Sequence, residues 1–294
     1  MANAIDIFRQ LAKPLDPEPT GAEPSLRRLE GIRVVLFDLY GTLLVSGSGE
    51  VGIAAAASDT AAAEAFAAVG LETAVPSVKI TQCLFDTILA MHDELRAAGR
   101  DWPEVDIRVV WPRVLAALAS EGGVDPAACE KVDVARLAVE YEARANTAWL
   151  MPGAAECLAG LRAGGRVLGI ISNAQFYTLD LMEALFGFRA EPLGFDPALQ
   201  FYSYQHGWGK PSRRLFEMAV HELAERSIRP AEALCVGNDM LNDVLAARDV
   251  GFRTALFAGD ARSLRLREDD PQVKEVKPDL ILTRLGQLLE CIIY

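Results

Sequence analysis

The sequence predicts an α/β protein, in which a parallel β-sheet is covered by helices and an all-helical segment follows the first strand. Three observations predict it. Short runs of β-branched and apolar residues recur along the chain, helical patterns separate the later runs, and residues 51 to 150 contain helical patterns without a convincing strand. Strands that alternate with helices are typical of parallel sheets buried on both faces.

The first 30 residues are expected to form a tail or linker. Residues 14 to 25, PLDPEPTGAEPS, are rich in Pro, Glu and Gly, a composition typical of loops and linkers. A short amphipathic piece around Ile5, Phe8 and Leu11 precedes them and could dock on the body. We therefore expect the folded core to begin at residue 31.

The core is expected to comprise residues 31–44 and 151–294. Its predicted strands are IRVVLF at 32–37, RVLGII at 166–171, ALCV at 233–236, TALF at 254–257 and LIL at 280–282. One of the intervening helices begins near Pro211, a residue suited to a first helical turn, and places Leu215, Phe216 and Leu223 on one face.

Residues 45–150 are expected to form a helical domain inserted between the first two core strands. Helical patterns lie near 58–69, 80–98, 107–120 and 126–146, and glycines punctuate them. The stretch SGSGEVG at residues 46–52 would be the flexible entry to this insertion.

Composition limits the possible partners and compartments. The formal net charge of −12 argues against nucleic acid and anionic membranes as partners. No apolar run approaches the ~18 residues that span a bilayer, and no secretory signal is visible at the start. The five scattered cysteines suit buried thiols in a reducing compartment, so we expect a cytoplasmic protein. A small anionic substrate would need a locally positive pocket.

Polar residues follow the ends of the predicted strands. In a parallel α/β sheet, ligands bind beyond the carboxyl ends of the strands, so these residues are expected to converge at one edge. They are Asp38, Tyr40, Gly41 and Thr42 after the first run, Ser172 and Asn173 after the second, Lys210 before a helix, and Asn238, Asp239 and Asp243 after ALCV.

Four of these stretches occur in the order of the motifs of one superfamily. FDLYGTL, IISNA, GKPSRRLF and VGNDMLND resemble the first to fourth motifs of the haloacid dehalogenase-like (HAD) hydrolases. The resemblance covers residues 31–50 and 151–260. It implies a Rossmann-like core, and the helical insertion sits where that superfamily carries its C1-type cap.

The resemblance also implies roles for individual residues. Asp38 would be the nucleophile that forms an aspartyl-enzyme intermediate. Thr42, Ser172 and Asn173 would hold substrate oxygens, and Lys210 would neutralise the developing charge. In a phosphatase of this superfamily, Mg²⁺ would be held by Asp38, the backbone carbonyl of Tyr40 and a fourth-motif acid, either Asp239 or Asp243.

Tyr40 departs from the usual phosphatase pattern, in which an Asp two residues after the nucleophile acts as acid and base. A tyrosine there is similar to the 2-haloacid dehalogenases, whose halide leaving group needs no proton. Other features oppose that reading. No Arg lies between residues 34 and 95 to receive a halide, Phe216 replaces a tyrosine six residues after the motif lysine, and two acids remain in the fourth motif.

The sequence thus favours a Mg²⁺-dependent phosphatase that acts on a small phosphorylated metabolite. A dehalogenase-like enzyme and a catalytically impaired binding or regulatory protein remain the alternatives. As a phenol, Tyr40 could donate a proton but would be a poor base at neutral pH. We therefore expect good substrates to have leaving groups of low pKa, and Glu50 is a candidate for the missing base.

Overall fold

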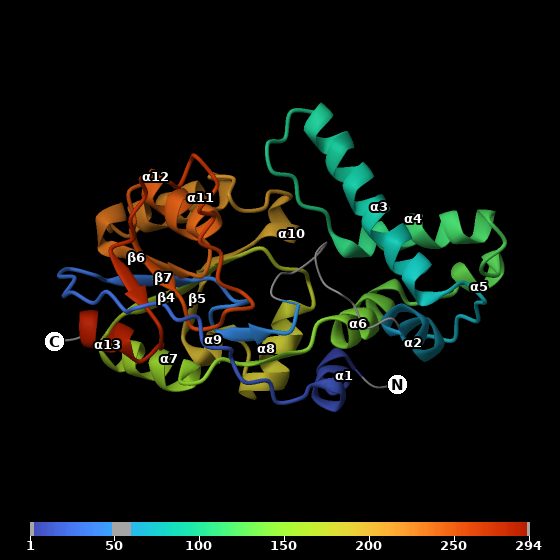
Figure 1. The fold of residues 1–294 in the computed structure, drawn as a ribbon, viewed down its shortest axis with the longest axis horizontal. Coiled ribbons are helices and arrows are strands. Elements are labelled where there is room, and N and C mark those ends of the chain that lie inside the picture. The colour runs from blue at the N-terminus through green and yellow to red at the C-terminus, as the bar shows by residue number, and fades with distance from the viewer. Residues whose placement is uncertain (1–2, 49–59, 293–294) are drawn as a thin grey trace.

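The computed structural model, which describes residues 3–48 and 60–292, contains a six-stranded sheet in which every strand pair is parallel (Figure 1). In spatial order the strands are β5 (Phe195–Tyr202), β4 (Val167–Ser172), β1 (Val34–Phe37), β6 (Ala233–Gly237), β7 (Arg253–Phe257) and β8 (Leu280–Leu282). The predicted α/β core with a parallel sheet is therefore confirmed.

Strand β1 lies in the middle of the sheet, and its four residues are completely buried. Alternate side chains pack on opposite faces, as the two-residue period of a strand requires. Val34 and Leu36 join a cluster with Leu215 of one helix layer, whereas Val35 and Phe37 join the larger cluster on the other face. Such a strand needs apolar residues at every position, which is why VVLF reads as an unbroken apolar run.

Helices cover both faces of the sheet. On the face with Val34 and Leu36 lie α11 and the short α12; on the other lie α7, α8 and α13 (Figure 1). Their bounds are α7 Ala154–Ala163, α8 Thr178–Phe186, α11 Arg214–Glu225, α12 Ala246–Asp249 and α13 Gln287–Ile292. The short α9 (Ala190–Leu193) and α10 (Ser203–His206) flank β5, and a π-helical turn over Met240–Leu245 follows β6.

Strand β5 was not predicted from the sequence. It forms one edge of the sheet, and Asp196 and Pro197 stand near its start. Proline cannot donate a hydrogen bond to a neighbouring strand and is tolerated at sheet edges, so the run FDPALQFY lacks the apolar continuity of the central strands.

A second, two-stranded antiparallel sheet joins the two ends of the inserted segment. It pairs β2 (Leu44–Ser46) with β3 (Ala148–Leu150). Strand β3 lies at the end of the range 45–150 that was expected to be wholly helical, so that expectation was wrong there. The pairing brings both connections of the insertion together directly beside the loop that follows β1.

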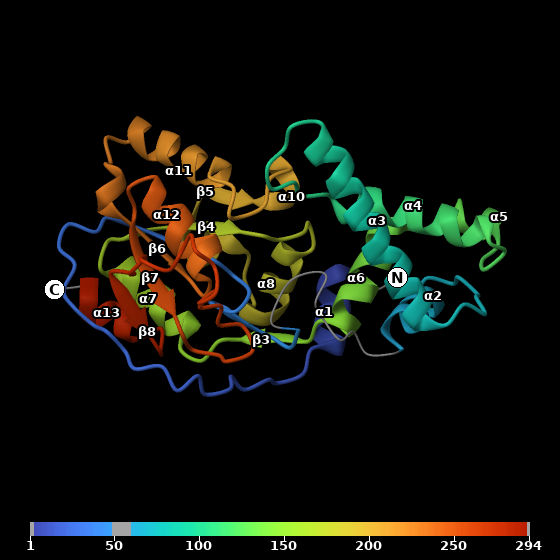
Figure 2. The same cartoon turned by 45° about the horizontal axis from the view of Figure 1, so that its top comes forward.

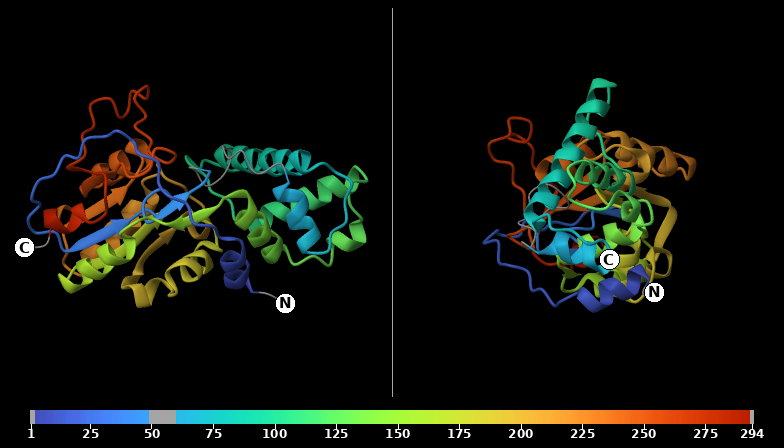
Figure 3. Two further views of the ribbon diagram at one scale, coloured as in Figure 1. Left: turned by 60° about the horizontal axis from the view of Figure 1, so that its bottom comes forward. Right: turned by 90° about the vertical axis from the view of Figure 1, so that its right-hand side faces the viewer.

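Residues 61–145, called here the helical segment, form five helices and lie beside the core (Figure 3). They are α2 (Ala61–Ala68), α3 (Ser77–Ala97), α4 (Ile107–Ser120), α5 (Pro126–Cys129) and α6 (Val134–Ala145). The single helix expected over 126–146 is two, because Asp133 begins α6 by accepting a hydrogen bond from the Arg136 amide. The division of the chain into a core and a cap domain stays a prediction.

The N-terminal segment is attached to the body along its length. Helix α1 (Ala4–Leu11) buries Ile7 and Phe8 against α8 of the core and α6 of the helical segment. The chain then runs along the core (Figure 2), where Thr20 donates to the Ala258 carbonyl and Ser25 pairs with Ile281. It therefore links the helical segment to the far end of the core.

In the described parts of the chain, none of the helices is both long and apolar enough to cross a lipid bilayer.

Candidate active site

Asp38 directly follows β1 and lies between the carboxyl ends of β4 and β6. The Ser172 hydroxyl, at the end of β4, donates to Asp38 Oδ1 over 2.9 Å, and the Lys210 ammonium donates to the same oxygen over 2.7 Å. Among the described residues, both hydrogen bonds to this carboxylate are made to Oδ1. The second oxygen, Oδ2, is therefore left without a hydrogen bond from the described residues.

Lys210 connects Asp38 to Asp243. Its ammonium also donates to Asp243 Oδ1 over 2.5 Å, and all three side chains are buried. Burial alone would lower the pKa of Lys210, but Asp243 and Asp38 raise it above its ordinary value, so the lysine keeps its positive charge. The predicted meeting of the first, third and fourth motifs is thus present in the structure.

Asn173 holds the loop that carries Lys210. Its side-chain oxygen accepts from the Lys210 amide at 2.7 Å, and its side-chain nitrogen donates to the Lys210 carbonyl at 3.2 Å. Both polar ends of the side chain are therefore engaged with the backbone. Asn173 thus positions the loop of the lysine, and its predicted contact with substrate oxygens stays a prediction.

Thr42 lies in the turn after β1 and is fully buried. Its hydroxyl donates to Asn238 Oδ1 over 3.3 Å, and Asn238 in turn donates to the Ser263 carbonyl. Gly41 precedes Thr42 with φ of +80°, and a Cβ there would approach the side chains of Ser263 and Asn238 within 3 Å. Glycine is thus required at this position for its backbone conformation and for close packing.

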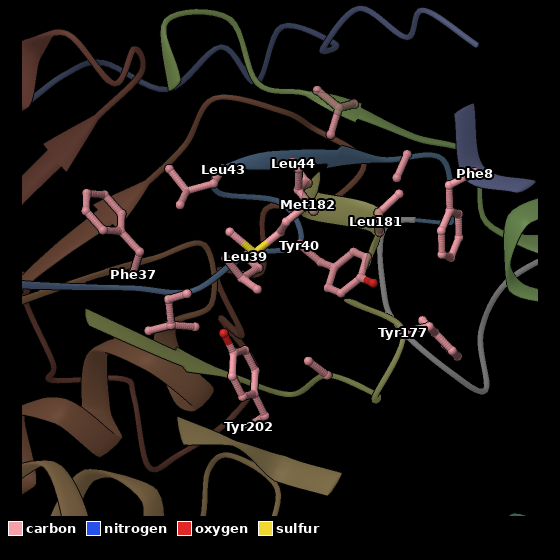
Figure 4. Close-up of a cluster of buried hydrophobic side chains, with 14 of the residues drawn as sticks. Phe8, Phe37, Leu39, Tyr40, Leu43, Leu44, Tyr177, Leu181, Met182 and Tyr202 are labelled. Carbon is pink, nitrogen blue, oxygen red and sulfur yellow. The ribbon is translucent and has the colours of Figure 1, made fainter. Parts of the chain in front are cut away.

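Tyr40 extends into the hydrophobic core. It belongs to a buried cluster with Leu44, Leu181 and Met182 (Figure 4), and its hydroxyl lies 3.1 Å from Thr178 Oγ1. Burial, reinforced by the charge of Glu142, raises the pKa of the Tyr40 phenol far above its ordinary value. The proton-donor role predicted for Tyr40 stays a prediction, and its contact with Thr178 does not favour it.

The Asp239 side chain is held by groups other than Lys210. The Asp239 carboxylate accepts from the amides of Leu241 and Asn242, and Arg267 forms an ion pair with it at 2.6 Å. Asp38 and Asp243, by contrast, converge on the Lys210 ammonium, so their Oδ1 atoms can be no further apart than the sum of its two contacts. Of the two fourth-motif acids, Asp243 therefore lies close to Asp38, whereas the Asp239 carboxylate is engaged by Arg267 and two backbone amides, and the roles of both as metal ligands stay predictions.

The described residues contain no group of three or more His, Cys, Asp or Glu side chains arranged to hold a metal ion. Mg²⁺ is usually held by only one or two carboxylates together with water and substrate phosphate. Asp38 and Asp243 supply two carboxylates close to one another, so the chemistry of these donors fits Mg²⁺.

A cavity of about 280 Å³ opens between the helical segment and this edge of the sheet. Lys210, Gly209 and Asn173 line its core side, and the loop 102–107 borders it. The remaining lining comes chiefly from α3 and α6 and includes Leu84, Phe85, Ile88, His92, Arg96, Ala138, Tyr141, Glu142 and Asn146. Its volume is near the lower end of the range for small-molecule sites.

Two acids that line this cavity were not found by sequence reasoning. Burial raises the pKa of Glu104 to about 7, although the Val105 amide and the Ser203 hydroxyl both donate to its carboxylate. Burial also raises the pKa of Glu142, which accepts from Tyr177 and Asn146. Neither belongs to a motif, and only the helical periodicity of α6 could have placed Glu142 on an inward face.

Glu50, expected as a possible base, lies outside the described residues, as does most of the SGSGEVG stretch. Its position relative to Asp38 stays a prediction.

The chain shares sequence with two hydrolases. It is 33% identical over 89 residues to an uncharacterised hydrolase of Schizosaccharomyces pombe, over 29% of this chain and 36% of that protein. It is 29% identical over 140 residues to the glyceraldehyde 3-phosphate phosphatase of Pyrococcus furiosus, over 48% of this chain and 53% of that one. The chain thus spans about a third to a half of the length of these curated relatives.

Solved structures share the fold at lower identity. A 2-haloacid dehalogenase from Pseudomonas syringae superposes with a TM-score of 0.57 at 21% identity, covering 88% of this chain and 97% of that one. A predicted phosphoglycolate phosphatase from Haemophilus somnus gives a TM-score of 0.50 at 18% identity with the same coverage. These likenesses establish the fold and leave the reaction open.

A family model described as haloacid dehalogenase-like hydrolase matches residues 32–251, which include all four motifs and the whole of the helical segment. The converged Asp38, Ser172, Lys210 and Asp243 occupy the four motif positions within that range. The chain therefore belongs to the haloacid dehalogenase-like hydrolase family.

Proposed function

We propose that this protein is a phosphatase that acts on a small phosphorylated metabolite through an aspartyl-phosphate intermediate on Asp38. The observation that carries the proposal is the buried arrangement in which Lys210 contacts both Asp38 and Asp243. A fourth-motif acid beside the nucleophile supplies negative oxygens that suit a metal-assisted phosphate site. The partial sequence match to a phosphatase supports the same choice.

In the first step, Asp38 Oδ2 attacks phosphorus, and the bond from phosphorus to the leaving oxygen breaks with its electron pair going to that oxygen. Ser172 and Lys210 hold Oδ1, so the carboxylate cannot rotate away from the substrate. The fixed ammonium also offsets the negative charge that develops on the phosphoryl oxygens. Water then attacks phosphorus, which releases phosphate and restores Asp38.

The Tyr40 hydroxyl contacts Thr178 in the core, which does not favour its use in place of the acid that is missing at position 40. General acid–base assistance typically contributes 10²–10⁴ in rate. A leaving group that departs without a proton avoids this loss. Acyl or enol phosphates are therefore the substrates that this site should turn over best.

Mg²⁺ would be held by Asp38, Asp243 and the Tyr40 carbonyl. When bound, it would neutralise charge on the phosphate. The residues of the chain would still have to orient the substrate, and Lys210 stands beside the same two carboxylates for that purpose.

A second function, hydrolysis of a carbon–halogen bond, is favoured by one observation. The Tyr40 hydroxyl lies in the core, and a halide leaving group needs no proton donor. The intermediate would then be a carboxylate ester of Asp38, and water would attack its carbonyl carbon rather than phosphorus.

The experiment that tests the proposal is a screen of acyl phosphates, simple alkyl phosphates and 2-haloacids, with Mg²⁺ and with a chelator. The proposal expects phosphate release that is fastest for acyl phosphates and is lost with the chelator. Halide release without phosphate release would overturn the proposal and show a dehalogenase instead. No release of either ion would leave a binding or regulatory protein as the conclusion.

A further inference from the structure

The cavity beside Lys210 changes in character along its length. We call the end that borders Lys210 the near end of the cavity. Two hydrogen bonds connect it to the core: the Gly209 amide donates to the Trp102 carbonyl over 2.8 Å, and Ser46 donates to Asn146 over 2.8 Å. Polar residues gather at this end, where Lys210 faces the reacting carboxylate. The phosphate of a substrate would therefore sit here.

The far end is built from apolar side chains. On α3, Leu84 and Ile88 precede His92 and Arg96 at intervals of four residues, so all four share one face of the helix. On α6, Ala138 lies about 12 Å along the helix before Asn146. On α3 the lining thus changes from apolar at Leu84 and Ile88 to polar at His92 and Arg96, and on α6 the apolar Ala138 stands at the end farther from Asn146.

The change from polar to apolar lining along the cavity determines which organic groups can bind there. Hydroxyl groups placed against Leu84, Ile88 and Ala138 would lose their hydrogen bonds to water without replacement, which opposes binding of a polyhydroxylated substrate. Methylene groups in the same place would gain from burial. The two acids of the lining, Glu104 and Glu142, already accept hydrogen bonds from protein donors.

We propose that the substrates are phosphates whose organic part is an apolar chain or ring, which the helical segment encloses between α3 and α6. This inference rests on the proposed phosphatase function for the phosphate end only. The apolar end is argued from the lining residues alone, so the two can be tested separately.

The test is calorimetric titration of the full chain with n-alkylphosphonates, from methyl to octyl, which carry the head group but cannot be hydrolysed. Affinity is expected to rise about threefold to fourfold for each added methylene and then to level off when the tail reaches the end of the cavity. A hydroxylated alkylphosphonate of equal length should bind at least tenfold more weakly. An affinity that does not depend on chain length would overturn the proposal.

A pair of adjacent residues on α3 supplies matched variants. Ile88 lines the cavity, whereas Leu89 is 42% exposed on another face of the same helix. Ile88→Ser should weaken the longest phosphonate about tenfold and leave methylphosphonate unchanged, and Leu89→Ser should change neither. Equal behaviour of the two variants would contradict the placement of the tail against α3.

Titration with n-alkylcarboxylates of the same lengths separates the two proposals. If carboxylates show the chain-length dependence and phosphonates do not bind, the apolar site stands and the phosphatase function fails. If phosphonates bind equally well at every length, the phosphate end stands and the apolar substrate class fails. Failure of both series to bind would overturn the apolar site as well.

Discussion

The carboxyl edge of the sheet and the cavity beside it are built on opposite physical principles. At the sheet edge, three buried charged groups, Asp38, Lys210 and Asp243, are held within hydrogen-bonding distance of one another. In the cavity, apolar side chains of α3 and α6, such as Leu84 and Ile88, form one part of the wall. Under the proposed function, the edge would perform the reaction on any substrate, and the wall would select among substrates.

The largest effect is expected from Asp38→Asn. An amide at this position is a much weaker nucleophile than a carboxylate, so kcat should fall by at least about 10³-fold for every substrate. Steady-state kinetics across substrates of different chain length would show this. A loss confined to long-chain substrates would contradict the assignment of the chemistry to the sheet edge.

Lys210→Met should reduce both stability and turnover. Removing the ammonium leaves two buried carboxylates without a counter-charge, which should lower the free energy of unfolding by about 3–5 kcal/mol. Urea denaturation would measure this loss. Adding Asp243→Asn should recover part of the stability, and Lys274→Met, at an exposed position, should leave it within about 0.5 kcal/mol. Unchanged stability in Lys210→Met would refute the buried charge network.

Ser172→Ala should have a smaller effect at the same edge. Loss of a hydrogen bond to a charged group is typically worth about 1.5–3 kcal/mol, so kcat/KM should fall by about 10- to 100-fold. Ser172→Thr, which keeps the hydroxyl, should lose less. Kinetics on a short and a long substrate should give the same ratio, and a ratio that depends on chain length would weaken the comparison.

The pH dependence of stability in Glu104→Gln tests whether this acid, at the border of the cavity, keeps its proton in the folded protein. The raised pKa of Glu104, about 7, means that the folded protein keeps a proton which the unfolded chain releases near its ordinary value of 4.5. The unfolded state therefore binds fewer protons between these values, and stability falls as pH rises through them. Glu104→Gln removes this loss of stability. The free energy of unfolding of the variant should therefore exceed that of the unchanged protein by about 1–3 kcal/mol between pH 4.5 and 8. Chemical denaturation at several pH values would measure it, and parallel stability curves would contradict the buried proton.

The two regions also differ in how far the sequence predicts them. The meeting of Asp38, Ser172 and Asp243 could be predicted because each follows a predicted strand of one parallel sheet, and the carboxyl ends of such strands lie at one edge. Lys210 was placed with them by its motif, since strand β5 before it was not predicted. The same reasoning placed Asp239 with them, but a side chain beside the turn can rotate, and Arg267 and two backbone amides hold it elsewhere. Neighbours that come from distant parts of the chain decide such a choice.

The cavity wall could not be predicted in the same way. Helical patterns located α3 and α4 closely, but the face that each helix turns towards the core depends on how the helices pack. That packing involves α1, whose amphipathic pattern predicted docking but not its contacts. The ring centroids of Phe8 and Tyr177 lie 6.2 Å apart, and Tyr177 donates to Glu142. The sequence likewise did not predict that the Tyr40 hydroxyl would contact Thr178.

The central claim is that Asp38 becomes covalently phosphorylated during turnover. The most direct measurement is acid quenching of the protein during steady-state hydrolysis of an acyl phosphate, followed by mass spectrometry of the peptide that contains Asp38. The account predicts one phosphoryl group on that peptide and none in the Asp38→Asn protein. Sustained phosphate release by the Asp38→Asn protein, or a phosphoryl group found only on another residue, would contradict it.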